Sequence, residues 1–150
     1  MAEGPKILVV EARFYEDIAD ELVRGAAAVF VEAGAEVTRV AVPGALEIPA
    51  AINMALLAAE EGEADAFDGF LALGCVIRGE TSHYDIVAGE SARALMDLSL
   101  SFGVPLANGI LTVENADQAW ARARVGQKNK GGTAAQAVLD MIAVRNRLGA

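Results

Sequence analysis

The sequence predicts an α/β fold, a three-layer sandwich in which a four-stranded parallel sheet carries helices on both faces. Short apolar segments of strand length alternate along the chain with longer segments of helical periodicity, and strands joined by helix-length crossovers are normally parallel. The segments KILVV (6–10) and GFLALGCVI (69–77) show no alternation of apolar and polar residues, which is typical of strands buried on both faces. With 150 residues, the chain is expected to form one domain, residues 1–150.

Apolar spacing and turn residues define the elements of the first half. The first helix has apolar residues every three or four positions, and Gly34 provides its C-terminal cap. In the second helix, Pro49 falls in the first turn, where proline is tolerated. In order, the predicted elements are strand 6–10, helix 15–33, strand 36–42 and helix 46–61.

The second half continues the same alternation. The segment 69–77 is too short for a surface helix, and Gly103 separates the long helix that follows it from the last strand. Because the carboxyl ends of parallel strands share one edge of the sheet, the loops after the four strands should line a single ligand crevice. The predicted elements are strand 69–77, helix 82–102, strand 104–111 and helices 115–124 and 133–148.

Composition narrows the class of protein. A hydrophobic content of 54% is high for a soluble monomer of this size, so we expect a homo-oligomer. The longest uncharged apolar stretch, 48–59, is well short of the about 20 residues of a membrane span, and a net charge of −9 argues against a nucleic-acid surface. The amino terminus lacks the pattern of a secretory signal and the single cysteine fits a reducing compartment, so a cytoplasmic location is expected.

Positive charge is concentrated in one segment. Between residues 118 and 131 there is no acidic residue, whereas four basic residues occur there: Arg122, Arg124, Lys128 and Lys130. A solvated loop and helix end explains them as well as a phosphate clamp does, so both interpretations stay open.

The loops at the strand ends carry candidate binding residues. Phe14 is either core filler or a stacking platform for a flat heterocycle. Glu47 either favours the dipole of its helix or binds ligand hydroxyl groups, and Gly44 and Ala45 would let that ligand approach the backbone. Asn108 lies within the fourth strand.

The only histidine and the only cysteine lie in GCVIRGETSHYDIV (74–87). Helix N–H groups near Thr81 would attract an anion, although Thr81 or Ser82 could equally serve as a plain N-cap. His83 beside such a site favours acid–base catalysis over a structural role, since an imidazole exchanges protons near neutral pH. Cys75 ends an apolar run and is the weaker candidate, as a nucleophile.

Sequence motifs of other functional classes are absent or incomplete. No G-x-G-x-x-G follows the first strand, and the segment 126–133 differs from a P-loop because Gly132 stands where that motif requires lysine. One histidine and one cysteine give no metal-ligand spacing, so no metal is predicted. A receiver-like signalling domain would need an acidic cluster at the strand ends, which Glu11 alone does not supply.

Five features together closely resemble the 6,7-dimethyl-8-ribityllumazine synthase family. They are Phe14 after the first strand, PGALEIP (43–49), GCVIRGETSHYD (74–85), NGILTVEN (108–115) and NKG (129–131). The resemblance extends from about residue 6 to residue 148, and the second and third of these segments are highly specific in combination. It implies a flavodoxin-like fold and a transferase of riboflavin biosynthesis.

The resemblance implies a condensation of 5-amino-6-(D-ribitylamino)uracil with 3,4-dihydroxy-2-butanone 4-phosphate, which releases phosphate and two waters without a cofactor or metal. It also implies a homopentamer, or a 60-subunit shell of twelve pentamers, with active sites between adjacent subunits.

The same resemblance implies roles for individual residues. Phe14 stacks on the pyrimidine, Ala45, Leu46 and Glu47 surround the ribityl chain, and Cys75, Val76 and Ile77 contact the heterocycle through their backbone. Glu80 and Thr81 lie at the butanone phosphate, Arg122 of a neighbouring subunit clamps that phosphate with Lys130 nearby, and His83 moves protons.

Two positions depart from the family pattern. Asn108, on the pyrimidine side, stands where many members have a phenylalanine that covers the pyrimidine, and Tyr15 replaces a frequent asparagine. A paralogue specialised for ligand binding or for assembly could carry such changes. A flavin- or lumazine-binding module is therefore the alternative, and a two-substrate turnover assay separates it from an enzyme.

Overall fold

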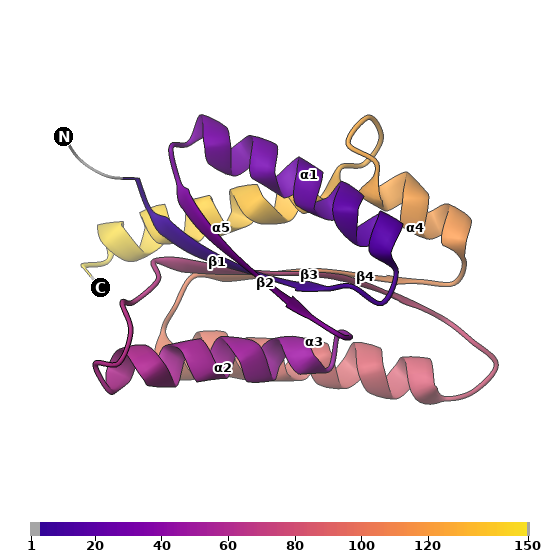
Figure 1. Cartoon of the computed structure of the whole chain (residues 1–150), viewed down its shortest axis with the longest axis horizontal. Coiled ribbons are helices and arrows are strands. Elements are labelled where there is room, and N and C mark those ends of the chain that lie inside the picture. The colour runs from indigo at the N-terminus through magenta and orange to yellow at the C-terminus, as the bar shows by residue number, and fades with distance from the viewer. Residues whose placement is uncertain (1–3, 150) are drawn as a thin grey trace.

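A computed structural model describes residues 4–149. In chain order the elements are β1 (Lys6–Ala12), α1 (Glu16–Glu32), β2 (Glu36–Val42), α2 (Glu47–Glu60), β3 (Gly69–Ile77), α3 (His83–Phe102), β4 (Leu106–Val113), α4 (Ala116–Ala123) and α5 (Lys130–Arg147). The four strands are parallel and lie in the order β2-β1-β3-β4. Helices α1, α4 and α5 cover one face of the sheet and α2 and α3 the other (Figure 1). The predicted three-layer, flavodoxin-like sandwich is confirmed.

The central strands β1 and β3 explain the apolar segments without alternation. On β1, Ile7 and Val9 belong to the apolar layer beneath α1 and α5, whereas Leu8 and Val10 belong to the layer above α2 and α3. The edge strand β2 is almost entirely exposed, and β4 alternates between buried and less buried positions. Burial on both faces therefore holds only for the two strands with a neighbour on each side.

Strand boundaries shift by up to two residues from the prediction. β1 continues to Ala12, and β4 spans Leu106–Val113 instead of 104–111. The N–H of Val104 donates to the carbonyl oxygen of Ser99 (3.3 Å) and closes a turn in which Gly103 takes a φ of 62°. Val104 is thus engaged by the end of α3 and does not join the sheet.

Helix α5 begins at Lys130, three residues earlier than predicted. Asn129 takes a φ of 46°, and its side-chain oxygen accepts a hydrogen bond from the N–H of Gly132 (3.2 Å), as an N-cap does. The two glycines of this turn are buried against α1. A Cβ on Gly131 would lie 2.9 Å from the carbonyl carbon of Leu22, so α1 and α5 pack this closely only because glycine is present.

The connection between α4 and α5 is tied to α1. The carboxylate of Glu21 accepts a hydrogen bond from the N–H of Val125 (2.9 Å) and pairs with Arg24 (3.1 Å). These contacts hold the pKa of Glu21 below its usual value, and the hydrogen bond from the N–H of Val125 contributes most. The tether fixes the chain between Arg122 and Lys130.

The outer faces of the helices carry large apolar side chains that are more than half exposed. They are Val31 of α1, Met54 of α2, and Ile86, Met96 and Leu100 of α3. No helix within residues 4–149 has both the length and the apolar character to cross a membrane.

Candidate active site

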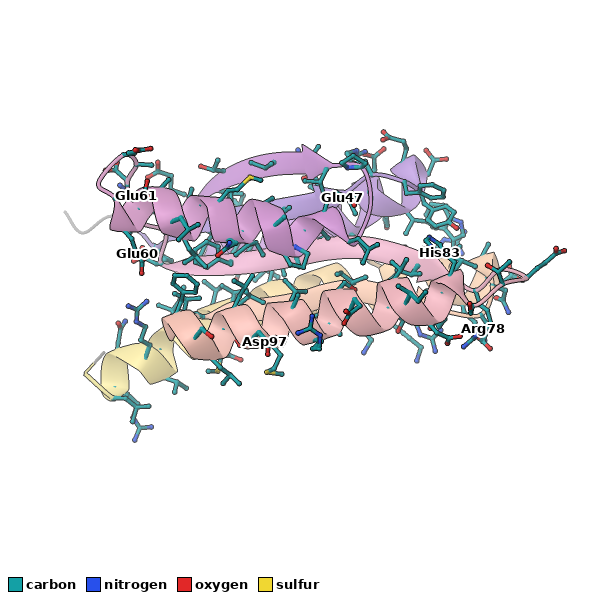
Figure 2. All side chains as sticks on the ribbon, turned by 90° about the horizontal axis from the view of Figure 1, so that it is seen from below. Glu47, Glu60, Glu61, Arg78, His83 and Asp97 are labelled. Carbon is teal, nitrogen blue, oxygen red and sulfur yellow. The ribbon has the colours of Figure 1, made fainter. Side chains whose placement is uncertain are left out.

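A cavity of about 450 Å³ opens at the carboxyl edge of the sheet. Its walls come from the loops after β1, β2 and β3 and from the first turns of α3. Two of its residues, Glu47 and His83, lie toward the same end of the molecule, away from Glu60 and Glu61 at the far end of α2 (Figure 2). The loops after three of the four strands thus form one crevice, as the parallel order of the strands predicts, whereas no residue of β4 or of the loop after it lines this cavity in the described chain.

The loop after β1 supplies two aromatic rings. Phe14 is 74% exposed, so it is not core filler in this chain. Its ring meets that of Tyr15 edge-on, with centroids 4.9 Å apart. Tyr15 occupies the N-cap position of α1 and packs against the apolar layer beneath that helix. Phe14 therefore presents an exposed aromatic ring on the cavity wall, as a stacking platform requires.

The loop after β2 turns tightly into α2. Ala45 is buried, and the N–H of Glu47, the first residue of α2, donates to the carbonyl oxygen of Gly44 (3.1 Å). A Cβ on Gly44 would lie 3.2 Å from the Oε1 atom of Glu47. The glycine leaves room for the carboxylate beside the backbone of the cavity wall.

The loop after β3 leads into the amino terminus of α3. Ser82 holds the N-cap position without a side-chain hydrogen bond, whereas the Oγ1 atom of Thr81 accepts one from the N–H of His83 (3.3 Å). The exposed His83 is the first residue of α3, where N–H groups lack intrahelical partners and the helix dipole favours an anion. A proton-exchanging side chain and an anion-binding backbone thus occur at the same point.

Arg78, outside the cavity, connects this loop to neighbouring elements. Its Nε atom donates to Glu114, just after β4 (2.8 Å), and its guanidinium lies 3.4 Å from Asp85 and 4.2 Å from the ring centroid of Tyr84. These contacts link the ends of β3 and β4 to the first turn of α3. In Figure 2, Arg78 lies near His83 at the same end of the molecule.

Cys75 is a weak candidate nucleophile for a physical reason. Burial raises the pKa of its thiol to about 11, so the thiol is protonated at neutral pH. The side chain packs with the apolar layer beneath α1, near Tyr15. Its position on the cavity wall is compatible with a contact through the backbone.

A second surface hollow of about 510 Å³ lies along the edge strand β4 and the adjoining faces of α4 and α5. It contains Asn108, Arg122 and Lys130, and it shares no lining residue with the first cavity. The side-chain oxygen of Asn108 accepts a hydrogen bond from the N–H of Ile110 (2.9 Å), and Arg122 donates to the carbonyl oxygen of Gln118 (3.0 Å). Two basic side chains thus lie apart from the cavity with the histidine.

The structure divides the predicted site residues into three sets. The first cavity brings together Phe14, Ala45, Leu46, Glu47, Cys75, Val76, Ile77, Thr81 and His83. The second hollow holds Asn108, Arg122 and Lys130. Glu80 is exposed in the loop after β3 and lines neither.

Beyond the predicted site residues, the cavity is also lined by Tyr15, Pro43, Gly44, Gly79, Tyr84 and Val87. Val87 lies four residues after His83, so both occur on the same side of α3, and this helical spacing could have found it. Tyr84 has no such signal, because its place on the cavity wall depends on the path of the loop before α3.

A family model and the similar proteins found by comparison carry the same family name. Residues 4–146 match a family model described as 6,7-dimethyl-8-ribityllumazine synthase. The 6,7-dimethyl-8-ribityllumazine synthase 1 of Rhizobium meliloti (strain 1021) is 63% identical over 144 residues, which cover 96% of this chain and 94% of that protein. A 6,7-dimethyl-8-ribityllumazine synthase of Agrobacterium fabrum is 59% identical over 145 residues, 97% of each chain. One of Azorhizobium caulinodans is 58% identical over 96% of this chain and 88% of its own.

Proposed function

The chain belongs to the 6,7-dimethyl-8-ribityllumazine synthase family, and we propose that its active site is the cavity at the carboxyl edge of the sheet, completed by the second hollow of a neighbouring copy. The enzyme condenses 5-amino-6-(D-ribitylamino)uracil with 3,4-dihydroxy-2-butanone 4-phosphate to 6,7-dimethyl-8-ribityllumazine, the penultimate step of riboflavin biosynthesis. One observation carries the location of the site: Phe14, Glu47 and His83, which follow three different strands, line the same cavity.

The pyrimidine substrate binds between the loops after β1 and β2. Phe14 stacks on its ring, a contact that adds about 0.5–1.5 kcal/mol beyond burial. Glu47 accepts hydrogen bonds from ribityl hydroxyl groups beside Ala45 and Leu46. The backbone of residues 75–77 contacts the edge of the heterocycle. The exposure of Phe14 and the room that Gly44 leaves for the Glu47 carboxylate support this assignment.

The butanone phosphate binds at the amino terminus of α3, where Glu80 and Thr81 present backbone N–H groups to the phosphate. His83 transfers protons at this point. Condensation of the amine with the ketone requires a proton on the departing water, and loss of phosphate requires removal of a proton from the substrate carbon. A single imidazole between the two substrates can serve both steps in turn.

Positioning supplies most of the rate enhancement in this mechanism. Holding the amine next to the ketone replaces up to about 7–11 kcal/mol of the barrier, whereas acid–base assistance adds about 10²–10⁴-fold. The chain therefore needs few reactive side chains, and a protonated Cys75 fits that requirement.

The basic side chains that bind the phosphate come from a neighbouring subunit. Arg122 and Lys130 line a hollow separate from the cavity with His83, which supports their contribution to the phosphate site by a second copy. Asn108 reaches the pyrimidine from the same neighbour. The exposed apolar side chains on α2 and α3 supply surface for such an association. We propose a homopentamer, alone or as the unit of a 60-subunit shell, in the cytoplasm.

Complementation between inactive subunits tests the site. Hybrid oligomers are assembled from one chain that carries Phe14→Ala with His83→Ala and another that carries Arg122→Ala, and product absorbance is measured with both substrates. Each parent should be impaired, and random mixing should restore about a quarter of the sites in a ring of heterologous interfaces.

A mixture in which both chains carry His83→Ala is the control and should regain no activity. Hybrids that also regain none would contradict a site shared between subunits. A wild-type protein that binds product tightly but shows no turnover would instead support the binding module.

A further inference from the structure

One buried carboxylate has no part in the reaction described above. Glu11 of β1 is only 3% exposed and lies three residues before Phe14. In the sheet it lies between Ala41 of β2 and Leu73 of β3, both of which are apolar. A charged carboxylate persists at such a position only when cations and hydrogen bonds compensate for the lost water.

Two arginines from different segments provide that compensation. Arg39 of β2 donates from Nε to one carboxylate oxygen of Glu11 (2.8 Å) and from Nη2 to the other (2.7 Å). Arg13 donates from Nη1 to the second of these oxygens (2.8 Å). Burial raises the pKa of Glu11, but the two arginines outweigh burial and hold that pKa below its usual value.

Arg13 extends the network to the start of α1. Its guanidinium contacts the carboxylate of Glu16 (3.3 Å) and forms an ion pair with Asp20. Its backbone N–H donates to the carbonyl oxygen of Val42 at the end of β2 (3.0 Å). The residue next to Phe14 is thus bound to three elements at once.

We propose that Glu11 and Arg13 are positioning residues that hold Phe14 at the cavity rim for the pyrimidine substrate. This inference rests on the proposed function, in which Phe14 stacks on that substrate. Because the ring of Phe14 is 74% exposed, its own packing restrains it weakly. The direction in which the ring leaves the backbone is set one residue earlier, where Arg13 is held.

The proposal makes a selective prediction. The network supports the loop after β1, whereas the butanone phosphate is assigned to the loop after β3 and to a neighbouring subunit. Loss of the network should therefore impair one substrate and spare the other. A general loss of folding would instead affect both.

Glu11→Gln and Arg13→Met are the two test variants. Glu11→Gln keeps the size of the buried side chain but removes its charge. Arg13→Met serves if Glu11→Gln fails to fold, because it leaves Glu11 paired with Arg39. Arg24→Ala is the matched control, since it removes an ion pair on α1 with Glu21 away from the cavity. Phe14→Ala is measured in parallel.

Two measurements are made on each assembled variant. Steady-state kinetics should give a KM for the pyrimidine substrate about 2- to 12-fold higher and an unchanged KM for the butanone phosphate. This factor is what loss of an aromatic stacking contact corresponds to. Hydrogen exchange of a peptide over residues 12–18 should become faster, with wild-type exchange in β3. Arg13→Lys should recover part of both effects, and Arg24→Ala should alter neither.

Each other outcome overturns the proposal. Unchanged exchange over residues 12–18 means that the network does not hold the loop. Faster exchange with an unchanged KM, while Phe14→Ala raises that KM, refutes the positioning role and leaves the site assignment intact. If Phe14→Ala also leaves the KM unchanged, the assignment of Phe14 fails, and the positioning role fails with it.

Discussion

Gly131→Ala tests a close backbone contact between α5 and α1. The glycine lies in the first turn of α5, and a Cβ there would meet the carbonyl oxygen of Leu22 and lie 2.9 Å from its carbonyl carbon. Ordinary contact begins at 3.4 Å, so α1 and α5 would have to separate by at least about 0.5 Å. A backbone atom cannot rotate away as a side chain can.

The expected magnitude combines two opposing terms. Alanine in place of glycine in a helix gains about 1 kcal/mol of intrinsic propensity. Overpacking of a buried contact costs about 1–3 kcal/mol, and the upper value applies because the atoms met are backbone atoms of the fully buried Leu22. We expect a net loss of about 2 kcal/mol, which corresponds to a Tm about 4–8 °C lower.

Urea unfolding followed by circular dichroism is the assay, at several protein concentrations because association adds to apparent stability. Gly89→Ala in α3 is the matched control, since a Cβ there meets no atom within 4 Å in the described chain. It should stabilise the protein by about 0.5–1 kcal/mol. Assembly mass is measured as well, because Gly89 follows Ile86 by three residues and precedes Met96 by seven, on the face of α3 proposed for association. A Gly131→Ala variant as stable as wild type would refute the steric reasoning.

Three further predictions concern the site. His83→Ala should slow turnover by about 10²-fold or more without abolishing it, because proximity remains; steady-state turnover equal to wild type would remove His83 from the mechanism. Arg122→Ala should raise the KM for the butanone phosphate and leave the KM for the pyrimidine substrate unchanged, and the opposite pattern in two-substrate kinetics would contradict the phosphate clamp. Cys75 should react slowly with iodoacetamide at pH 7, and its rate should rise with pH toward about 11, since the raised pKa keeps the thiol protonated; a plateau near pH 8.5 would mean that the thiol is not buried as described.

The fold was readily predictable because its signals are local. Apolar segments without alternation identified β1 and β3, and the spacing of apolar residues identified the helices. The predicted start of α5 is three residues too late, because Gly131 and Gly132 have the local appearance of a turn. Their real role is to admit α1, and that contact joins residues more than 100 positions apart.

The candidate site was predictable in part. Phe14, Glu47 and His83 each follow a strand, so the parallel order of the strands was enough to bring them to one edge. The separation of Arg122 and Lys130 from that cavity does not follow from order along the chain. It depends on the position of α4 and α5 beside the edge strand β4.

The parallel α/β fold, the family and the strand-end loops that carry the reactive groups follow from the order of the residues alone, because hydrophobic periodicity and short motifs are properties of neighbouring residues. Three features depend on the folded arrangement: which groups share a cavity, the exposure of Phe14, and the pairing of Glu11 with Arg13 and Arg39. The physical reason is that burial and electrostatic pairing depend on distances in space. Residues 11 and 39 lie 28 positions apart in the chain and 2.7 Å apart at their charged atoms.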